Sequence, residues 1–359
     1  MNVLSQQAYE KWSEKGVVKI LELFGGIGAS TKAMKNLLAA VLDQTSLDLK
    51  LKVIDYVEWK QDRVQAYNAM NPQRYEQQDI TTWNLCPDIC VHGSPCQDNS
   101  AANLNADEEL GRSLLMLRTI DILKEMGDWK PRVVIWENVK GALYKKTMPI
   151  FNQYLNDMQK LGYTNSFDVV SAYDHSLPQK RERVFCVSIL GEQVFDFSRL
   201  KQRLLQPMNE FIDFDLIDER YVVNAPSMLN RIEDLASVED KAAAKGRYRF
   251  LHTIKDFCYT ITERPDRAPS MGVIQMPDGR YRYATERECW RLMGFDDADF
   301  DLMLQQFPMN ESGLNRTLYR LAGNSIAVPV LESIFEVILN EDYATELVTN
   351  VDGQLELIC

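Results

Sequence analysis

Short apolar runs alternate with longer amphipathic stretches through the first half of the chain. The runs predict strands, and the stretches between them predict helices. Strands are predicted at residues 17–23, 51–57, 89–91, 132–136, 167–172 and 183–190. Helices are predicted from residue 28 to about 41, over 113–126 and over 150–161. This alternation is typical of an α/β fold with a doubly wound, mostly parallel sheet.

A glycine-rich loop and three polar or reactive side chains follow directly on the predicted strands. Residues 24–28 follow the first strand and Glu58 follows the second. Cys96 comes shortly after the third, and Glu137 follows the fourth. Ligands of doubly wound sheets bind beyond the carboxyl ends of the strands. We therefore expect these groups to share one active site.

The alternation stops after about residue 191. Residues 192–285 are irregular, with proline and glycine punctuation and short β-like pieces at 257–262 and 280–283. Helical patterns return at 285–293 and 328–339. We interpret the chain as a larger catalytic and cofactor-binding domain and a smaller, irregular, β-rich domain. The larger domain comprises residues 1–191 and 322–359, and the smaller one comprises 192–321.

Composition narrows the class of protein. With 359 residues and 45% hydrophobic content, the chain can bury a large core. We find no run of roughly 18 apolar residues that would span a bilayer, and residues 1–16 lack the apolar core of a signal peptide. The seven cysteines are scattered and odd in number, which indicates no disulfide framework. We expect a cytoplasmic protein with no membrane partner.

We also expect no metal site. Cys86 and Cys90 have a spacing that metal ligands can adopt, but no second pair of ligands lies nearby and the chain has only three histidines. A closed zinc site requires about four ligands.

The net charge of −12 weighs against a nucleic-acid partner, because phosphate contacts demand a basic face. The charge is unevenly distributed, however. Residues 241–291 contain eleven Lys or Arg and six Asp or Glu, a net charge of +5, whereas 192–240 are acidic. A basic surface of this kind is sufficient for DNA, although an ordinary solvated face explains it equally well.

Each chemical motif is ambiguous by itself. The glycines of 24–28 allow a ligand close to the backbone, and the following helix favours an anionic group, but a tight turn has the same pattern. The loop lacks the G-x-G-x-x-G spacing of dehydrogenases, while Glu58 suits a ribose diol. Cys96 lies on a loop that Gly93 and Pro95 constrain, where a nucleophile is plausible, although most lone cysteines fill cores. Glu137 is either a solvated strand end or a general acid.

Taken together and in order, these motifs closely resemble the cytosine-C5 DNA methyltransferase family of prokaryotes and phages. The resemblance covers residues 17–190 and 285–339. Its motifs are Phe-Gly-Gly-Ile-Gly at 24–28, Pro-Cys-Gln at 95–97, Glu-Asn-Val at 137–139, Gln-Lys-Arg-Glu-Arg at 179–183, Arg-Glu-Cys-Trp-Arg-Leu-Met-Gly-Phe at 287–295 and Gly-Asn-Ser at 323–325.

The resemblance implies a role for each catalytic residue. Cys96 matches the nucleophile that adds to carbon 6 of cytosine, and Glu137 matches the carboxyl group that bonds the N3 and N4 edge of the ring. Arg183 matches the arginine that holds the base near O2. Arg181 resembles its structural support, and Asn138 resembles an orienting residue. The base has to leave the duplex to be reached, so base flipping is implied.

The resemblance also implies the cofactor, S-adenosylmethionine, with S-adenosylhomocysteine as the product. Glu58 matches the ribose ligand, and Phe24 matches the aromatic side chain that packs on the cofactor. The C-terminal helix is then expected to pack back on the first domain. The further cofactor-binding residues that it implies are Gly26, Ile27, Gly28, Trp59, Asp79, Ile80, Asn324 and Ser325.

Some positions depart from the family pattern. Glu22 replaces the commoner Asp, Ala29 replaces a frequent Gly, and Asn99 stands where an aromatic residue is usual. Residues 36–50 are longer than the pattern predicts. Target recognition is expected within about 230–283, where the family varies. The candidate DNA contacts are Ser100, Lys245, Arg247, Tyr248, Arg249, Thr260 and Thr262.

Two other functions fit parts of the sequence. A tRNA cytosine-C5 methyltransferase uses the same catalytic motifs, and the Phe-Cys-Tyr-Thr of 257–260 weakly resembles the Cys-Phe-Thr element of that branch. A non-catalytic DNA-binding regulator on the same fold is expected to have lost Cys96, Glu137 or the glycine loop, all of which are present. The target site and any accompanying restriction endonuclease stay open. We predict a monomeric DNA (cytosine-5-)-methyltransferase that acts on double-stranded DNA.

Overall fold

The structure is a computed structural model. It describes residues 3–58, 60–76, 87–93, 115–236, 250–265, 269–309, 313–341, 347–349 and 355–357.

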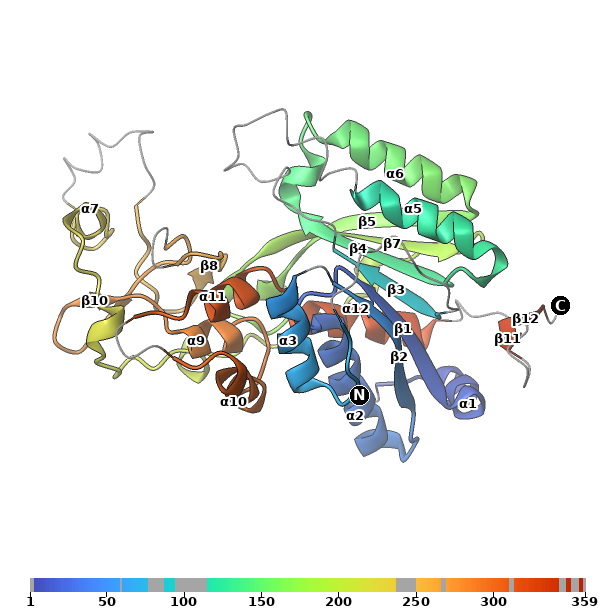
Figure 1. The fold of residues 1–359 in the computed structure, drawn as a ribbon, viewed down its shortest axis with the longest axis horizontal. Coiled ribbons are helices and arrows are strands. Elements are labelled where there is room, and N and C mark those ends of the chain that lie inside the picture. The colour runs from blue at the N-terminus through green and yellow to red at the C-terminus, as the bar shows by residue number, and fades with distance from the viewer. Residues whose placement is uncertain are drawn as a thin grey trace.

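A six-stranded sheet with the order β2-β1-β3-β4-β7-β5 forms the centre of the protein (Figure 1). Strands β1 to β4 pair in parallel, whereas β7 is antiparallel to both β4 and β5. The predicted α/β class with a mostly parallel sheet is confirmed, and the reversed direction of β7 was not predicted. The strands are β1 Val17–Leu23, β2 Lys50–Val57, β3 Ile89–His92, β4 Val133–Val139, β5 Tyr163–Ser171 and β7 Glu182–Leu190.

Helices cover both faces of this sheet, with α5 and α6 on one face and α2 and α12 on the other (Figure 1). The α-helices of the described residues are α1 Gln6–Lys15, α2 Ala29–Thr45, α3 Gln61–Met70, α5 Leu115–Met126, α6 Met148–Lys160, α7 Pro226–Leu229, α9 Glu286–Arg291, α10 Asp297–Gln306, α11 Arg316–Gly323 and α12 Val328–Asn340. Short 3-10 helices lie at Gly127–Trp129, Lys140–Leu143, Ala172–Asp174, Phe197–Arg199, Met208–Glu210 and Glu219–Tyr221.

The remaining strands are short and pair outside the central sheet. Strand β6 (Gln179–Lys180) pairs in parallel with β8 (Cys258–Tyr259), although 77 residues separate their ends in the sequence, from 180 to 258. Two antiparallel pairs join β9 (Ile274–Gln275) to β10 (Tyr281–Arg282) and β11 (Leu347–Thr349) to β12 (Leu355–Leu357). The β6–β8 pair therefore ties the second half of the chain to the motif at 179–183.

Successive side chains of a strand point to opposite faces, and the burial of β1 follows this rule. Val18 and Ile20 belong to the core that α2 and α12 cover, and Leu23 belongs to the core that α5 and α6 cover. Buried apolar side chains on both faces are why the strands read as continuous apolar runs in the sequence.

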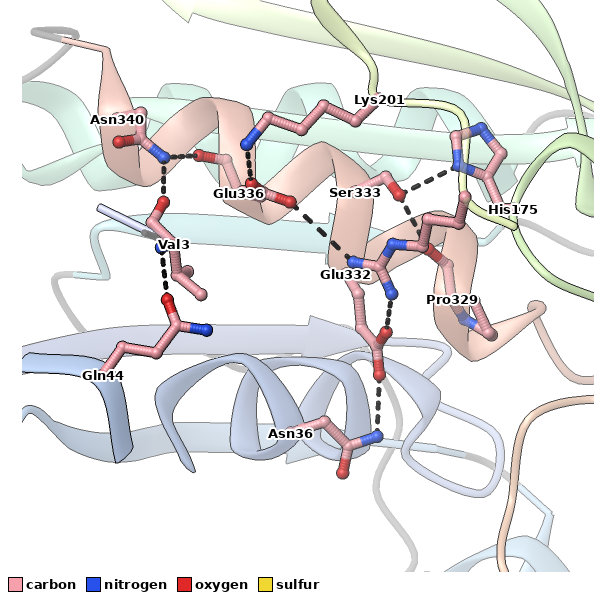
Figure 2. A network of polar contacts seen from close by, with 11 residues as sticks. Val3, Asn36, Gln44, His175, Lys201, Pro329, Glu332, Ser333, Glu336 and Asn340 are labelled. Atoms are coloured by element: carbon pink, nitrogen blue, oxygen red, sulfur yellow. Dashed lines mark hydrogen bonds and ion pairs between the residues drawn. The ribbon is translucent and has the colours of Figure 1, made fainter. Parts of the chain in front are cut away.

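Helix α12 packs against α2, as the family resemblance implied for the C-terminal helix (Figure 2). Asn36 of α2 donates a hydrogen bond from Nδ2 to Glu332 at 2.7 Å. His175, which follows β5, contacts the Ser333 hydroxyl through Nδ1 at 2.9 Å. The unexpectedly long segment 36–50 is thus mostly the second half of α2, and it gives α12 a surface to pack on.

One helical stretch, Arg316–Asn340, is long and apolar enough by composition to be compared with a membrane span. The stretch consists of α11, α12 and the residues between them, and 78% of its most apolar window is buried inside the protein. This degree of burial is typical of the core helix of a soluble protein, which accounts for the apolar composition of the stretch.

The second half of the chain contributes to two cores. Ile254, Cys258 and Ile261 belong to the large core beneath the sheet. A separate, smaller core gathers buried apolar side chains of the segments around β9 and β10. Its buried members are Val223, Ile232, Leu251, Val273, Tyr281 and Tyr283.

Candidate active site at the carboxyl edge of the sheet

The parallel register aligns the ends of β1, β2 and β3 with the middle of β4. The last residue of β1 lies opposite the last residues of β2 and β3, and the last residue of β3 lies opposite the fourth residue of β4. The next residues along the chain therefore stand at one level of the sheet edge. They are Phe24, Glu58, Gly93 and Glu137. Phe24, Glu58 and Glu137 thus lie at one level of the sheet, whereas Cys96, the fourth group expected there, lies outside the described residues.

Glu137 lies inside its strand rather than after it. We expected β4 to end at Trp136, but the strand continues to Val139 because it pairs with β7 along its whole length. Neighbouring residues of a strand point to opposite faces, so the side chain of Asn138 does not accompany the Glu137 carboxyl group. Asn138 is buried, and its Oδ1 accepts the backbone N–H of Val139 at 2.9 Å.

Two tyrosines pack against the inner side of the glycine loop. The Tyr56 hydroxyl donates to the carbonyl of Gly26. Gly28 adopts a left-handed φ of 81°, and a Cβ there would stand 2.6 Å from the ring of Tyr67, so only glycine fits. A Cβ at Gly26, by contrast, would meet nothing within 4 Å. The loop is therefore packed on its inner side and open on its outer side, where a ligand can approach the backbone.

Glu58 is a buried carboxylate that faces this loop. Its Oε2 accepts the backbone N–H of Gly26 at 3.1 Å and Nη1 of Arg63 at 3.2 Å. Its Oε1 accepts the backbone N–H of Lys60 at 2.9 Å. Each carboxylate oxygen has about two lone pairs, so this group can accept further hydrogen bonds, as a ribose diol would require. The open glycine loop and this acceptor fit the nucleoside cofactor that the family motifs imply.

A second carboxyl group, Glu22, lies beneath the loop with no exposed surface. Its Oε1 accepts the backbone N–H of Thr31 at 2.7 Å and also the Thr31 hydroxyl. Its Oε2 is buried and has no hydrogen-bond partner among the residues that the structure describes. Burial raises the pKa of Glu22 to about 7, although both Thr31 bonds oppose the shift. Glu22, which stands where aspartate is commoner, thus binds the start of α2 to the end of β1.

Glu137 and Arg183 form an ion pair across β4 and β7. Nε of Arg183 lies 3.3 Å from Oε1 of Glu137, and both side chains are largely buried. Burial raises the pKa of Glu137, and Arg183 and Arg181 oppose this shift. The other carboxyl oxygen stands 3.6 Å from where a Cβ of Gly93 would lie. Glu137 therefore faces the start of the loop that carries Cys96.

Arg181 is buried and joins three parts of the chain. Its guanidinium donates to the carbonyls of Ile261 at 3.1 Å, Gly323 at 3.1 Å and Ser325 at 2.7 Å. The neighbouring Gln179 accepts the backbone N–H of Ile261 at 3.1 Å. Arg181 therefore ties these segments together, and its predicted role as the support of Arg183 stays a prediction.

The remaining candidates among the described residues lie where Arg181 joins residues 260–263 to 323–325. Nδ2 of Asn324 donates to Oε1 of Glu263 at 2.6 Å, and the Ser325 hydroxyl donates to the Ile326 carbonyl. The Thr260 hydroxyl donates to the Lys180 carbonyl at 3.1 Å, and that of Thr262 accepts from Ser270 at 3.3 Å. The structure thus brings residues 260–263 and 323–325 together beside β6. The candidates outside the described residues are Trp59, Asp79, Ile80, Cys96, Ser100, Lys245, Arg247, Tyr248 and Arg249.

Several residues of the site were not predicted. Tyr56 and Tyr67 support the glycine loop, and Glu263 binds Asn324. An aromatic residue at the end of a strand beside a glycine loop is a signal that would have indicated Tyr56. Nothing local in the sequence indicates the partner of Glu263, because 60 residues lie between the two positions.

The fold is similar to that of solved methyltransferases. It superimposes on the Dnmt2 methyltransferase of S. pombe with a TM-score of 0.67 at 18% identity, over 90% of this chain and 98% of that one. A putative DNA modification methyltransferase encoded within an E. coli prophage gives 0.60 at 17% identity, over 90% and 99%. At these identities the likeness establishes the fold.

The sequence then defines the family. The model of the C-5 cytosine-specific DNA methylases matches residues 18–340, and this chain belongs to that family. It is 35% identical to the type II methyltransferase M2.ScrFI of Lactococcus lactis subsp. cremoris over 257 residues, which are 69% of this chain and 66% of that protein. It is 28% identical to the type II methyltransferase M.NlaX of Neisseria lactamica over 89% of this chain and 95% of that protein. The family depends on S-adenosylmethionine in general.

Proposed function

We propose that this protein transfers a methyl group from S-adenosylmethionine to carbon 5 of a flipped-out cytosine in a short site of double-stranded DNA. The observation that carries the proposal is the Glu137–Arg183 pair, which faces the start of the Cys96 loop. The pair lies on the same sheet edge as Glu58 and the glycine loop, in a chain of the C-5 cytosine-specific DNA methylase family.

The nucleophile of this reaction is the Cys96 thiolate. It adds to carbon 6 of the base, which sends electron density toward carbon 5 and toward N3. Carbon 5 would then bond the methyl group that the cofactor supplies, a base would remove the proton from carbon 5, and the Cys96 thiolate would leave carbon 6. Cys96 is thus regenerated, and the ring regains its double bond.

Glu137 and Arg183 serve the ring during this addition. The raised pKa of Glu137 favours a protonated carboxyl group, which can donate to N3 while its other oxygen accepts from the N4 amino group. Arg183 donates toward O2 of the base. Its ion pair with Glu137 keeps the guanidinium and the carboxyl group side by side. Placing donors where charge develops lowers the barrier to addition.

The cofactor supplies the electrophilic methyl group when it is bound. We propose that Gly26, Ile27 and Gly28 offer it their backbone and that Glu58 accepts from the ribose hydroxyls, with Phe24 packing alongside. The further residues proposed to hold it are Trp59, Asp79, Ile80, Asn324 and Ser325.

DNA recognition is proposed for residues 230–283 of a smaller domain, 192–321. Thr260 and Thr262 flank Ile261, whose carbonyl accepts a hydrogen bond from Arg181, and this contact supports DNA contacts close to the arginines proposed to hold the base. The other proposed contacts are Ser100, Lys245, Arg247, Tyr248 and Arg249. We further propose a monomer acting in the cytoplasm, because one flipped base requires no second subunit.

The test is transfer of a radiolabelled methyl group to duplex DNA and, in parallel, to tRNA. The proposal predicts label in DNA with the wild type and a loss of about 100-fold or more with Glu137→Gln, because a positioned proton donor contributes 100-fold to 10,000-fold. Glu192→Gln is the matched control, since Glu192 is exposed beyond the opposite end of β7. Label in tRNA alone would replace this proposal with a tRNA methyltransferase.

A further inference from the structure

The hydrogen bond between Glu263 and Asn324 joins two motifs that the proposed function keeps separate. Glu263 follows the proposed DNA contacts Thr260 and Thr262, whereas Asn324 belongs to the proposed cofactor pocket. Their side chains meet at 2.6 Å, a short distance for an amide donor and a carboxylate acceptor. The bond is partly buried, which strengthens it relative to one in water.

The partner fixes which way the Asn324 amide faces. An ionised carboxylate only accepts hydrogen bonds, so the Nδ2 side of Asn324 has to face Glu263. The carbonyl side, Oδ1, then faces away from Glu263 as an acceptor.

The backbones of residues 261–263 and 323–325 are in close contact around this bond. Gly323 lies so close to the other segment that a Cβ there would stand 2.5 Å and 2.6 Å from the carbonyl carbon and oxygen of Thr262. Arg181 donates to carbonyls on both sides, at Ile261 and Gly323. Residues 261–263 therefore cannot shift without moving 323–325.

Glu263 also lies within electrostatic reach of the Glu58 side of the pocket. Burial lowers the pKa of Lys60, and Glu263 and Glu58 both oppose this shift. Nearby, Arg320 of α11 pairs with Asp62 of α3 at 2.5 Å. The Glu263–Asn324 bond thus lies near the side of the site proposed to hold the cofactor.

We propose that Glu263 is a positioning residue that couples cofactor binding to DNA binding. This inference rests on the proposed function. Glu263 orients the Asn324 amide so that Oδ1 serves the cofactor, and it does so from the segment that carries Thr260 and Thr262. DNA that settles this segment also settles Asn324, so each ligand tightens the binding of the other by the same factor.

The experiment measures the Kd of S-adenosylhomocysteine by calorimetry, alone and with a duplex that the wild type methylates. We expect DNA to tighten binding to the wild type. Glu263→Ala should weaken binding in the presence of DNA about 10-fold and remove most of the tightening, as expected for loss of a hydrogen bond to a charged group. Glu263→Gln keeps an acceptor oxygen and should stay within about 3-fold of the wild type. Asp256→Ala, which removes an exposed carboxylate of the same segment, is the control for charge and should leave the tightening unchanged.

A mutant cycle separates positioning from general damage. Glu263→Ala should have little further effect once Asn324→Ala is present, because Glu263 acts through Asn324. If Glu263→Ala does not fold, Glu263→Asp takes its place, since it keeps the charge but falls short of the amide. A wild type that binds cofactor without tightening by DNA, or equal tightening in the wild type and the Glu263 variants, overturns the coupling alone. A wild type that binds no S-adenosylhomocysteine overturns the proposed function as well.

Discussion

Glu22 makes the stability of this protein depend on pH in a way that one substitution removes. The carboxyl group has no exposed surface, and burial raises its pKa from 4.5 to about 7. Between these two values the folded protein holds a proton that the unfolded chain has released. Stability from this group is therefore complete below about pH 4.5 and is lost as the pH rises through about 7.

The shift sets the magnitude. One pKa unit corresponds to about 1.36 kcal/mol, so the free energy of unfolding should fall by roughly 3 kcal/mol across this window because of Glu22 alone. Glu22→Gln is isosteric with the protonated form: its Oε1 can accept both bonds from Thr31, and its Nε2 replaces the protonated oxygen. The variant cannot ionise, so it should lack this loss.

The assay compares melting temperatures of the wild type and Glu22→Gln at half-unit steps between pH 5 and pH 8.5. Every other group titrates in both proteins, so their difference isolates Glu22. The difference should change by roughly 5 °C in favour of the variant as the pH rises. Glu14→Gln, at an exposed position of α1, is the control and should follow the wild type. Parallel curves for the wild type and Glu22→Gln would refute the reasoning.

Other predictions concern the junction beside β6 and the base pocket. Arg181→Lys should destabilise the protein by about 2–4 kcal/mol, seen as a lower melting temperature, because one ammonium group cannot reach all three carbonyls that the guanidinium binds. Gly323→Ala should cost about 1–3 kcal/mol and weaken S-adenosylhomocysteine binding, since its Cβ would overlap the backbone of Thr262; unchanged binding and melting would show that the two segments yield. Cys96 titrates in both proteins, so the ratio of the wild-type rate of methyl transfer to the Glu137→Gln rate should fall as the pH rises and Glu137 loses its proton, and a ratio that stays constant would contradict that assignment.

Much of the sheet was predictable because its strands are apolar on both faces. The predicted bounds of β1 agree with the structure, and those of β2 and β3 differ by one residue. The level of Glu58 and Glu137 on one edge follows from the parallel register of these strands. A strand buried on both sides leaves a sequence signal that does not depend on its neighbours.

The direction of β7 and the contacts it creates were not predictable in this way. An apolar run has the same pattern in either direction, and only pairing with β4 and β5 shows that β7 is reversed. That pairing extends β4 through Glu137 and sets Arg183 beside it. Tertiary pairs such as Glu263 with Asn324 lie equally beyond any local pattern.

Helix α1 was missed for a different reason. Its signals are in the sequence, since Ser5 caps the start through Ala8 and Gly16 ends it with a φ of 66°. Few of its side chains are apolar, however, and its burial depends mainly on Ala8 and Trp12. The Trp12 ring N–H donates to the Leu339 carbonyl at 2.9 Å, so α12 holds this helix in place.

The proposed reaction methylates cytosine in DNA with Cys96 as the nucleophile. The most direct test sequences 5-methylcytosine in plasmid DNA from cells that express either the wild type or Cys96→Ala. The account predicts methylation of one short sequence motif with the wild type and none with the variant. Unmodified cytosine in both, with both proteins soluble, or equal methylation by the variant, would contradict it.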